Sequence, residues 1–293
     1  MNTIQIEVSI IIINYNTDEL TIQAVESVLK YVKDISFEII VVDNDSKETK
    51  LASALSAFQN THFYPLDSNI GFGNANNFGY SKSKGDFIFL LNSDAFLIAE
   101  DTIPSFIDYL ENNKNVGCVG GNLVSEKGET NISYGNFLSI EKTLHDYGIK
   151  KARSEHFYAT LATSRQCCFN EPTPVDYLTA AAIMLKRELI EKLGLFDPRY
   201  FMYFEDMDLC FRYQKNGYLC VLLPDVKIVH IGGQSGLASF QNNTFLNKQI
   251  QYSKYLFLQN VSTLPTAYFL FLVGKMVSIY RRVKRKIKRK MNE

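Results

Sequence analysis

Three short apolar runs stand out in the first hundred residues of the chain. They are Val8 to Ile13, Phe37 to Val42 and Phe87 to Leu91, and each is followed by polar residues. Continuous runs of branched apolar residues of this length are typical of strands that are buried on both faces, as in a parallel sheet. The pattern therefore predicts strands at these three positions.

Helical periodicity lies between the apolar runs. A Thr17-Asp18 cap signal precedes apolar residues at spacings of three and four, namely Leu20, Ala24, Val25, Val28, Leu29 and Val32. Residues 51–58 form a second, shorter helical pattern. Strands that alternate with helices are typical of βαβ units, so we expect an open, mainly parallel α/β sheet flanked by helices over residues 1–125.

The second half of the chain is less regular. Residues 126–175 are polar and show no clear period, and we expect a loop-rich insertion that could cover a substrate. The pattern then predicts two helices that end at glycines and two strands, at Arg187–Leu193, Met207–Asn216, Tyr218–Leu223 and Val226–His230. We expect one large domain over 1–245, with halves at 1–125 and 126–245, and a separate tail over 246–293.

Polar side chains follow each apolar run. They are Asn14-Tyr15-Asn16, Asp43-Asn44-Asp45-Ser46 and Asn92-Ser93-Asp94. Ligands of open α/β sheets bind beyond the carboxyl ends of the strands, so one edge of the sheet would gather these residues. Asp43 would bind a ribose or a base N–H there, or it would cap a helix. Asp94 is a suitable ligand for a hard cation if partners lie nearby, or it caps the next helix.

An aromatic segment with three acids, "YFMYFEDMDLCFR", runs from Tyr200 to Arg212. Glu205 and Asp208 are three residues apart and share one helix face, while Asp206 lies about 100° away. The three acids could point into water in the first helical turn, where the helix dipole favours them. Alternatively, they lie in a shielded pocket, where burial disfavours their charged form. The crowding by aromatic residues favours the pocket.

Charge is distributed unevenly along a chain whose formal net charge is zero. Residues 281–290 contain eight Lys or Arg, and the rest of the chain, with Glu293 set aside, carries 23 basic and 30 acidic residues. An acidic body argues against a nucleic-acid enzyme, whereas a basic tail suits an anionic membrane surface. The cysteine count is five, without a CxxC pair, which argues against zinc and disulfide frameworks and favours a reducing compartment.

A glycine-rich loop, "SNIGFGNANNFG", begins at Ser68. A dinucleotide fingerprint needs G-x-G-x-x-G after the first strand, but Asn76 stands at the last glycine position and the loop follows a third run. An NAD-dependent oxidoreductase is therefore disfavoured, and the loop is expected to approach a ligand closely before a helix starts. His230 follows a strand; a lone histidine is more often structural, but nearness to Asp94 would favour a functional role.

Together these segments resemble the inverting nucleotide-sugar glycosyltransferases of family two, which have the GT-A fold. The resemblance covers about residues 6–236 and rests on six segments in the family's order: "VSIIIINYN", "VVDNDS", "NIGFGNANN", "LLNSD", "GLFDPRYFMYFEDMDLCFR" and "VHIGGQS". The most similar subgroup is the bacterial rhamnosyltransferase-like enzymes of cell-surface polysaccharide synthesis. The resemblance implies a GT-A domain over 1–245, with a nucleotide-binding half and an acceptor and catalytic half.

The resemblance also implies roles for individual residues. Tyr15 would stack on the base, Asp43 would bind the base or ribose, and Asn69 would line the nucleotide pocket. Asp94 would bind a divalent cation, Mg²⁺ or Mn²⁺, and His230 would be a second contact to the metal or the diphosphate. Asn92 stands where the fuller metal motif has an acid, so metal affinity is expected to be lower. Asp206 would be the general base, with Glu205 and Asp208 supporting the loop and Arg212 pairing with Asp208.

The resemblance implies transfer of a sugar from a nucleotide-sugar donor, with dTDP-rhamnose expected, to a glycan or polyprenyl-linked glycan. A UDP-hexose donor, or an inactive sugar-nucleotide or glycan-binding module, are the alternatives. A donor panel would separate the first two, and nucleotide release would separate an enzyme from a module. We expect no nucleic-acid partner.

The tail "TAYFLFLVGKMVSIYRRVKRKIKRK" begins apolar and ends basic. A spanning helix needs about 20 apolar residues, but Gln259, Asn260, Pro265 and Lys275 interrupt the 25 residues from Leu256 to Tyr280. We therefore expect an interfacial helix that lies on the cytoplasmic face of the membrane, with 281–290 on anionic lipid. The alternative is a packed C-terminal helix with a solvated basic end. The protein is expected to be cytoplasmic and peripheral to the membrane, with no signal peptide at its start.

Overall fold

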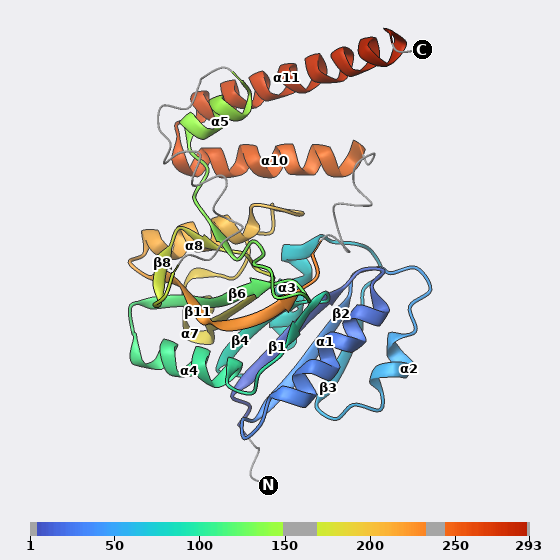
Figure 1. The fold of residues 1–293 in the computed structure, drawn as a ribbon, viewed down its shortest axis with the longest axis vertical. Coiled ribbons are helices and arrows are strands. Elements are labelled where there is room, and N and C mark those ends of the chain that lie inside the picture. Colours follow the sequence, from blue (N-terminus) through green and yellow to red (C-terminus); the bar gives the residue numbers. More distant parts are fainter. Residues whose placement is uncertain (1–4, 149–168, 233–243, 292–293) are drawn as a thin grey trace.

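A computed structural model describes residues 5–148, 169–232 and 244–291, and a twisted sheet forms its centre (Figure 1). The described strands run in the order β3-β2-β1-β4-β10-β6-β11-β5, with β8 paired to β11. Their bounds are β1 Val8–Asn14, β2 Phe37–Asp43, β3 Thr61–Pro65, β4 Phe87–Asn92, β5 Ala95–Leu97, β6 Val116–Val124, β8 Thr173–Val175, β10 Ala182–Lys186 and β11 Leu219–His230. Because β10, β5 and β8 run antiparallel to their neighbours and the rest run parallel, the sheet is mainly parallel, as predicted.

Helices cover both faces of this sheet, which explains why its strands are continuously apolar. In β1, Ile10 and Ile12 pack on one face and Ile11 and Ile13 on the other, since successive side chains of a strand alternate. The first face carries α1 (Asp18–Tyr31), α2 (Leu51–Leu55) and α4 (Thr102–Asn112). The second face carries α3 (Phe72–Lys82), α7 (Arg187–Leu193) and α8 (Glu205–Lys215).

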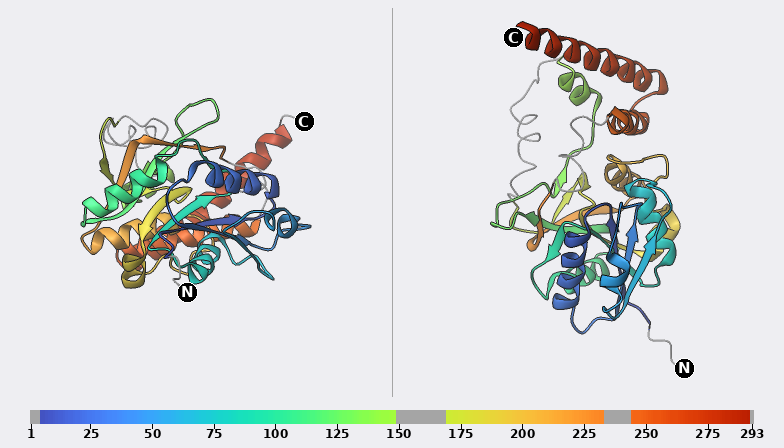
Figure 2. Two further views of the ribbon diagram at one scale, coloured as in Figure 1. Left: turned by 90° about the horizontal axis from the view of Figure 1, so that it is seen from below. Right: turned by 90° about the vertical axis from the view of Figure 1, so that its right-hand side faces the viewer.

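A third layer is built on α8 rather than on the sheet. It consists of α10 (Thr244–Val261) and α11 (Leu264–Met291), with α5 (Ile140–Asp146) beside them (Figures 1 and 2). A small apolar cluster joins the layers, with Met207 from α8, Phe257 and Leu258 from α10, and Ala267 and Leu270 from α11. Among the described residues, no helix is both long and apolar enough to cross a membrane.

Several predicted element bounds differ from the structure, among them the helix expected at Met207–Asn216, which is α8 at Glu205–Lys215. The strands expected at Tyr218–Leu223 and Val226–His230 are one strand, β11, whose pairing with β6 shifts register between Leu223 and Lys227. The helix expected over 51–58 ends at Leu55. Much of the expected insertion at 126–175 lies outside the described residues, while its described part holds α5 and two short strands, β8 and β7 (Tyr134–Gly135), the latter paired with β9 (Tyr177–Leu178).

Candidate active site

The carboxyl ends of β1, β2 and β4 meet at one edge of the sheet. In register, Asn14 lies opposite Asp43, and Ile13 lies opposite Asn92. Asn14 Nδ2 donates a hydrogen bond to Asp43 Oδ1 (2.7 Å), and the backbone N–H of Ser46 donates to Asp43 Oδ2 (3.1 Å). These bonds fix the buried Asp43 carboxylate at the end of its strand, between β1 and the loop that follows β2.

Asp94 and His230 lie side by side at the same edge. Their backbones are joined by the antiparallel pairing of β5 with β11, in which His230 lies opposite Ala95, and the N–H of Ile231 donates to the carbonyl of Asp94. His230 Nε2 is 3.3 Å from Asp94 Oδ1. The pairing explains how two residues that are far apart in the sequence meet, and it gives the histidine the neighbour that favours a functional role.

Several buried polar atoms at this point have no hydrogen-bond partner among the described residues. They are Asn92 Oδ1, His230 Nδ1 and, apart from its 3.3 Å contact with His230 Nε2, Asp94 Oδ1. Buried polar atoms are normally satisfied, and oxygen and imidazole ligands suit a divalent cation. Two ligands about 2.1 Å from an octahedral ion lie roughly 3 Å apart, which is close to the observed spacing of Asp94 and His230. These residues therefore fit a divalent cation.

Two of the three acids of α8 are withdrawn from water, and the third is only partly exposed. Glu205 and Asp208 are buried, and Asp206 is partly exposed. Asp208 accepts hydrogen bonds from Arg212 Nε (2.7 Å) and from Asn260 Nδ2 of α10 (2.9 Å). The predicted pairing of Asp208 with Arg212 is thus present, and Arg212 also donates to the carbonyl of Leu193 (2.6 Å). Asp208 therefore anchors the helix to the loop before it.

Asp206 lies across a short segment from the metal-binding candidates. Its carboxylate accepts hydrogen bonds from the backbone N–H groups of Met207 and Ala180. The next residue, Ala181, accepts from the N–H of Asn92 at 2.8 Å. The segment at 180–181 is thus in contact with Asp206 on one side and with the end of β4 on the other.

Burial raises the pKa of both acids at the start of α8. For Asp206 desolvation is the largest cause, followed by the neighbouring Cys210, and the hydrogen bonds from backbone N–H groups oppose it. For Glu205 desolvation is again the largest cause, followed by the charge of Asp206. Glu205 Oε2 is buried without a hydrogen-bond partner among the described residues. A carboxylate with a raised pKa that keeps some exposure is suited to take up a proton.

Comparison with known proteins identifies the family of this chain. The model of glycosyl transferase family 2 matches residues 9–194, which is more than half of the chain. The chain belongs to glycosyl transferase family 2. The strand ends with Asp43 and Asp94 lie within the matched region, whereas Asp206 and His230 lie beyond it.

Curated relatives of this glycosyl transferase family 2 member include rhamnosyltransferases at low identity. The N-acetylglucosaminyl-diphospho-decaprenol L-rhamnosyltransferase of Mycobacterium tuberculosis is 24% identical over 207 residues, covering 66% of this chain and 66% of the relative. The dTDP-rhamnosyl transferase RfbF of Shigella flexneri is 24% identical over 230 residues, covering 77% of this chain and 69% of the relative. The matches thus leave about a third of each relative's length unaligned.

Solved structures share the fold of this family member. The mannosyltransferase PcManGT from Pyrobaculum calidifontis, in complex with GDP-Man and Mn²⁺, aligns with a TM-score of 0.58 and 16% identity. The alignment covers 94% of this chain and 70% of the mannosyltransferase. The α/β sheet flanked by helices is thus a fold that this chain shares with the mannosyltransferase.

The asparagines of α3 hold the loop that leads to the candidate base of the glycosyltransferase. Asn77 Nδ2 donates to the carbonyl of Phe196 (2.8 Å), and Asn74 Nδ2 donates to that of Pro198 (3.1 Å). Gly71, at a φ of +88°, would bring a side chain into the backbone of Phe201. At Gly71 the loop thus approaches the protein's own backbone, and its close approach to a ligand stays a prediction. The sequence motifs did not identify this clamp, although the run "NANN" on one helix was its visible signal.

Two other predicted nucleotide contacts of the glycosyltransferase lie near this edge. Tyr15 follows β1 and is 37% exposed, so its ring is free to meet a ligand. Asn69 Oδ1 accepts hydrogen bonds from the N–H of Gly71 (2.9 Å) and from Asn44 Nδ2 (3.1 Å). Asn69 therefore fixes the conformation of the glycine loop, and its contact with a nucleotide stays a prediction.

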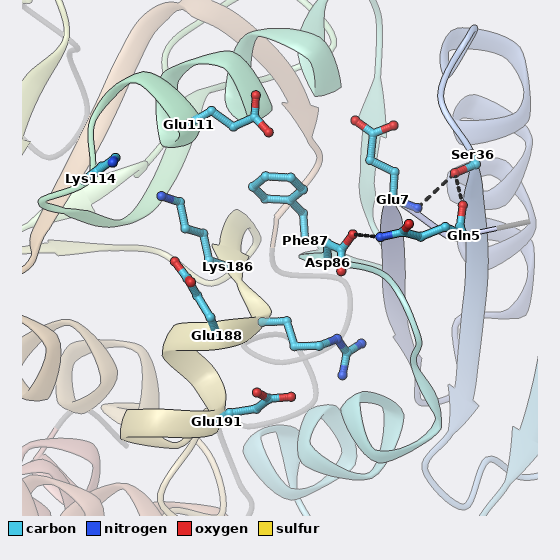
Figure 3. Close-up of a pocket in the computed structure, with 11 residues that line it drawn as sticks. Gln5, Glu7, Ser36, Asp86, Phe87, Glu111, Lys114, Lys186, Glu188 and Glu191 are labelled. Atoms are coloured by element: carbon cyan, nitrogen blue, oxygen red, sulfur yellow. Dashed lines mark hydrogen bonds between the residues drawn. The ribbon is translucent and has the colours of Figure 1, made fainter.

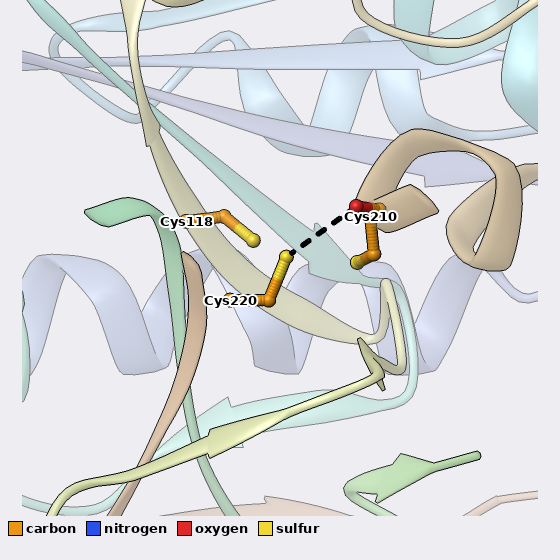
Figure 4. A group of neighbouring side chains, drawn as sticks. All are labelled: Cys118, Cys210 and Cys220. Atoms are coloured by element: carbon orange, nitrogen blue, oxygen red, sulfur yellow. Dashed lines mark hydrogen bonds between the residues drawn. The ribbon is translucent and has the colours of Figure 1, made fainter. Parts of the chain in front are cut away.

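Two further features lie away from this edge. Cys118, Cys210 and Cys220 are buried, and their sulfur atoms lie within 4.8 Å of one another, a donor set that suits a soft metal ion (Figure 4). The absence of a CxxC pair hid this cluster, because β6, α8 and β11 each supply one cysteine. An open pocket of about 1060 Å³, lined by Glu7, Asp86 and Arg187 among others, lies at the amino ends of β1 and β4 (Figure 3). It is at the opposite end of these strands from the candidate active site.

Proposed function

We propose that this protein is an inverting, metal-dependent glycosyltransferase. It transfers a sugar from a nucleotide-sugar donor, with dTDP-rhamnose as the expected donor. The acceptor is a glycan or polyprenyl-linked glycan of cell-surface polysaccharide. The observation that supports this most directly is the pair of Asp94 and His230, 3.3 Å apart at the strand ends, with unpartnered buried ligand atoms around it.

The residues divide the chemistry of transfer between them. Asp94 and His230, with Asn92, would hold a divalent cation, which as a Lewis acid offsets charge on a leaving diphosphate. Tyr15 would stack on the base of the donor, and Asp43 and Asn69 would shape the nucleoside pocket. Asp206 would take the proton from the acceptor hydroxyl, on the opposite face of the sugar from the leaving group. Its raised pKa makes it a stronger base than an exposed aspartate.

The names of similar proteins support the donor and the cofactor. One relative is described as a dTDP-rhamnosyl transferase, another as acting on a diphospho-decaprenol acceptor, and a structural neighbour holds Mn²⁺ with a nucleotide sugar. A UDP-hexose donor is the alternative within the same reaction. An inactive binding module is disfavoured because Asp94, His230 and Asp206 are all present. The expected location is the inner membrane surface, where a lipid-linked acceptor would be found.

The test is donor hydrolysis by the purified protein with Mg²⁺ or Mn²⁺. We expect nucleotide release from dTDP-rhamnose and not from UDP-glucose, UDP-galactose or UDP-N-acetylglucosamine. Asp94→Ala, which removes the ligand oxygens, should abolish the metal-dependent release, and Asp108→Ala, at an exposed acid on α4, should leave it unchanged. If nucleotide is released only from a UDP-sugar, that sugar nucleotide replaces dTDP-rhamnose as the assigned donor. If calorimetry detects no binding of any nucleotide sugar, the proposal is overturned.

A further inference from the structure

The outward side of α11 is apolar, although it faces away from the protein. Eight large apolar side chains along this helix are exposed, from 41% for Leu272 to 69% for Met276. They are Leu264, Tyr268, Phe269, Leu272, Met276, Ile279, Tyr280 and Val283. At 100° per residue these positions fall within roughly 160° of the helix circumference, with the exposed Lys275 near one edge of the same arc. They form one mainly apolar strip, which we name the outer face of α11.

The opposite side of the same helix is already packed. Ala267 and Leu270 are buried in the cluster with Phe257 and Leu258 of α10. At 100° per residue they lie on the side of the helix opposite the outer face. A helix that only packs on its own domain carries polar residues outward, whereas α11 is apolar on both sides. The alternative of a packed C-terminal helix with an ordinary solvated surface therefore does not account for the outer face.

The helix beneath α11 is attached to the candidate catalytic segment. In α10, Ser253 Oγ donates to the carbonyl of Met202 (3.1 Å), and Asn260 Nδ2 donates to Asp208 Oδ1 (2.9 Å). The ring of Phe257 packs beside that of Phe204, the residue before α8. The outer face is thus tied through one helix to the segment that contains Asp206. In Figure 1 and in the right-hand view of Figure 2 this layer lies at the end of the molecule opposite the start of β1, and β1 runs toward it.

The charges along the chain indicate what covers the outer face. Eight of the ten residues at 281–290 in the same helix are Lys or Arg, while the remainder of the chain is net acidic. An anionic bilayer would attract the helix and repel the body. Tyr268 and Tyr280 are of a residue type enriched at membrane interfaces. No described helix is long and apolar enough to cross a membrane, so the occupant is a surface on which α11 lies flat.

We propose that the outer face of α11 is a membrane-docking surface that recognises anionic lipid. The apolar strip enters the boundary between headgroups and acyl chains, and the basic run at 281–290 binds the negative surface. Docking in this way places α10, and with it the segment that bears Asp206, next to the membrane. This inference rests on the proposed function in one respect, because docking helps catalysis only if a lipid-linked acceptor lies at the membrane surface. The test of docking does not depend on catalysis.

The test is flotation of the full chain with vesicles of phosphatidylcholine, with and without phosphatidylglycerol. We expect the protein to float only with the anionic vesicles and to be released by raised salt. Met276→Gln with Ile279→Gln should prevent flotation without loss of folding, because both side chains are exposed. The matched control is Ile98→Gln with Leu219→Gln, which removes two exposed apolar side chains elsewhere and should float normally. Replacing Arg281, Arg282, Lys284 and Arg285 by Gln should weaken binding on the order of 1000-fold.

Three outcomes would overturn the proposal. They are no flotation of the wild-type chain, unchanged flotation of the Met276 and Ile279 variant, and a dimer in light scattering that this variant converts to a monomer. The last result would assign the outer face to a second copy of the chain. Donor hydrolysis without vesicles is measured in parallel on all variants. If the wild-type chain does not hydrolyse the donor, the result counts against the proposed function. If it hydrolyses the donor but does not float, the result counts against docking alone.

Discussion

Asp206 combines three properties that a general base needs. It keeps partial exposure, burial raises its pKa, and hydrogen bonds from the N–H groups of Met207 and Ala180 hold its carboxylate in place. Asp206→Asn keeps the shape but cannot accept the proton, so we expect the transfer rate to fall about 10²- to 10⁴-fold. Donor binding by calorimetry should be retained. The control is Glu191→Gln at an exposed position on α7, which should leave the rate unchanged. If this control is equally slow, the loss of rate reflects misfolding and not the loss of a general base.

The pH dependence of transfer follows from the same carboxylate. A general base works only when it is deprotonated, so the rate should fall as pH drops through the pKa of Asp206. Because that pKa is raised, the acid limb of the profile should lie above the usual range of an aspartate, near 3.9. Initial rates with saturating donor would be measured across pH, with unfolding followed separately. An acid limb at the ordinary aspartate value would contradict the assignment.

Single residues differ in how well the sequence reveals them. Asp208 and Arg212 are four residues apart on one helix, so their pairing could be predicted from spacing alone. The nearness of His230 to Asp94 could only be stated as a condition, because it depends on the pairing of β5 with β11. The contact of Asn260 with Asp208 was not foreseen, since nothing local links residues 52 positions apart. Spacing therefore predicts contacts within an element, and contacts between elements need the fold.

At the level of elements, α3 and the loop before α8 form a clamp that depends on Gly71. Its φ is +88°, and a Cβ there would clash with the backbone of Phe201. Gly71→Ala should lower the free energy of unfolding by more than Gly128→Ala, because Gly128 has a similar φ of +77° but no atom within 4 Å of the place its methyl group would take. We expect about 1 kcal/mol for Gly128→Ala and at least twice that for Gly71→Ala. Urea denaturation of both variants measures the difference, and equal losses would show that the clamp does not need the glycine.

Element types were predictable where hydrophobic periodicity was continuous. The three apolar runs match β1, β2 and β4 within a residue. Strands buried on both faces have apolar residues at every position, so the ends of the apolar run mark the ends of the strand. The strand β11 was expected as two, since Pro224-Asp225 has the appearance of a turn. In the sheet these residues fall within a register shift between Leu223 and Lys227, which lets the strand continue. Tertiary pairing thus overrode the local signal.

For the molecule as a whole, the sequence shows an acidic body and a basic tail but does not show how they are joined. The division into a domain over 1–245 and a tail over 246–293 follows the composition. In the structure, the last layer shares an apolar cluster with α8, and its hydrogen bonds reach the segment around Asp206. The tail is therefore part of the packed structure near the site, although the exposed side chains of its outer face are not members of that cluster.

Two truncations separate these parts of the tail. A chain that ends at Tyr280 keeps every buried member of the cluster, so we expect its melting temperature to stay within about 2 °C of the full chain. A chain that ends at residue 243 loses Phe257, Leu258, Ala267 and Leu270 and exposes Leu138 and Met207. The loss of several buried side chains, at about 2 kcal/mol each, amounts to much of the free energy of unfolding of an ordinary domain. This chain should therefore unfold or aggregate. Thermal unfolding followed by circular dichroism would distinguish them. Equal stability of the two truncated chains would mean that α10 and α11 are an appendage, and the link between the membrane-facing layer and Asp206 would then have to be abandoned.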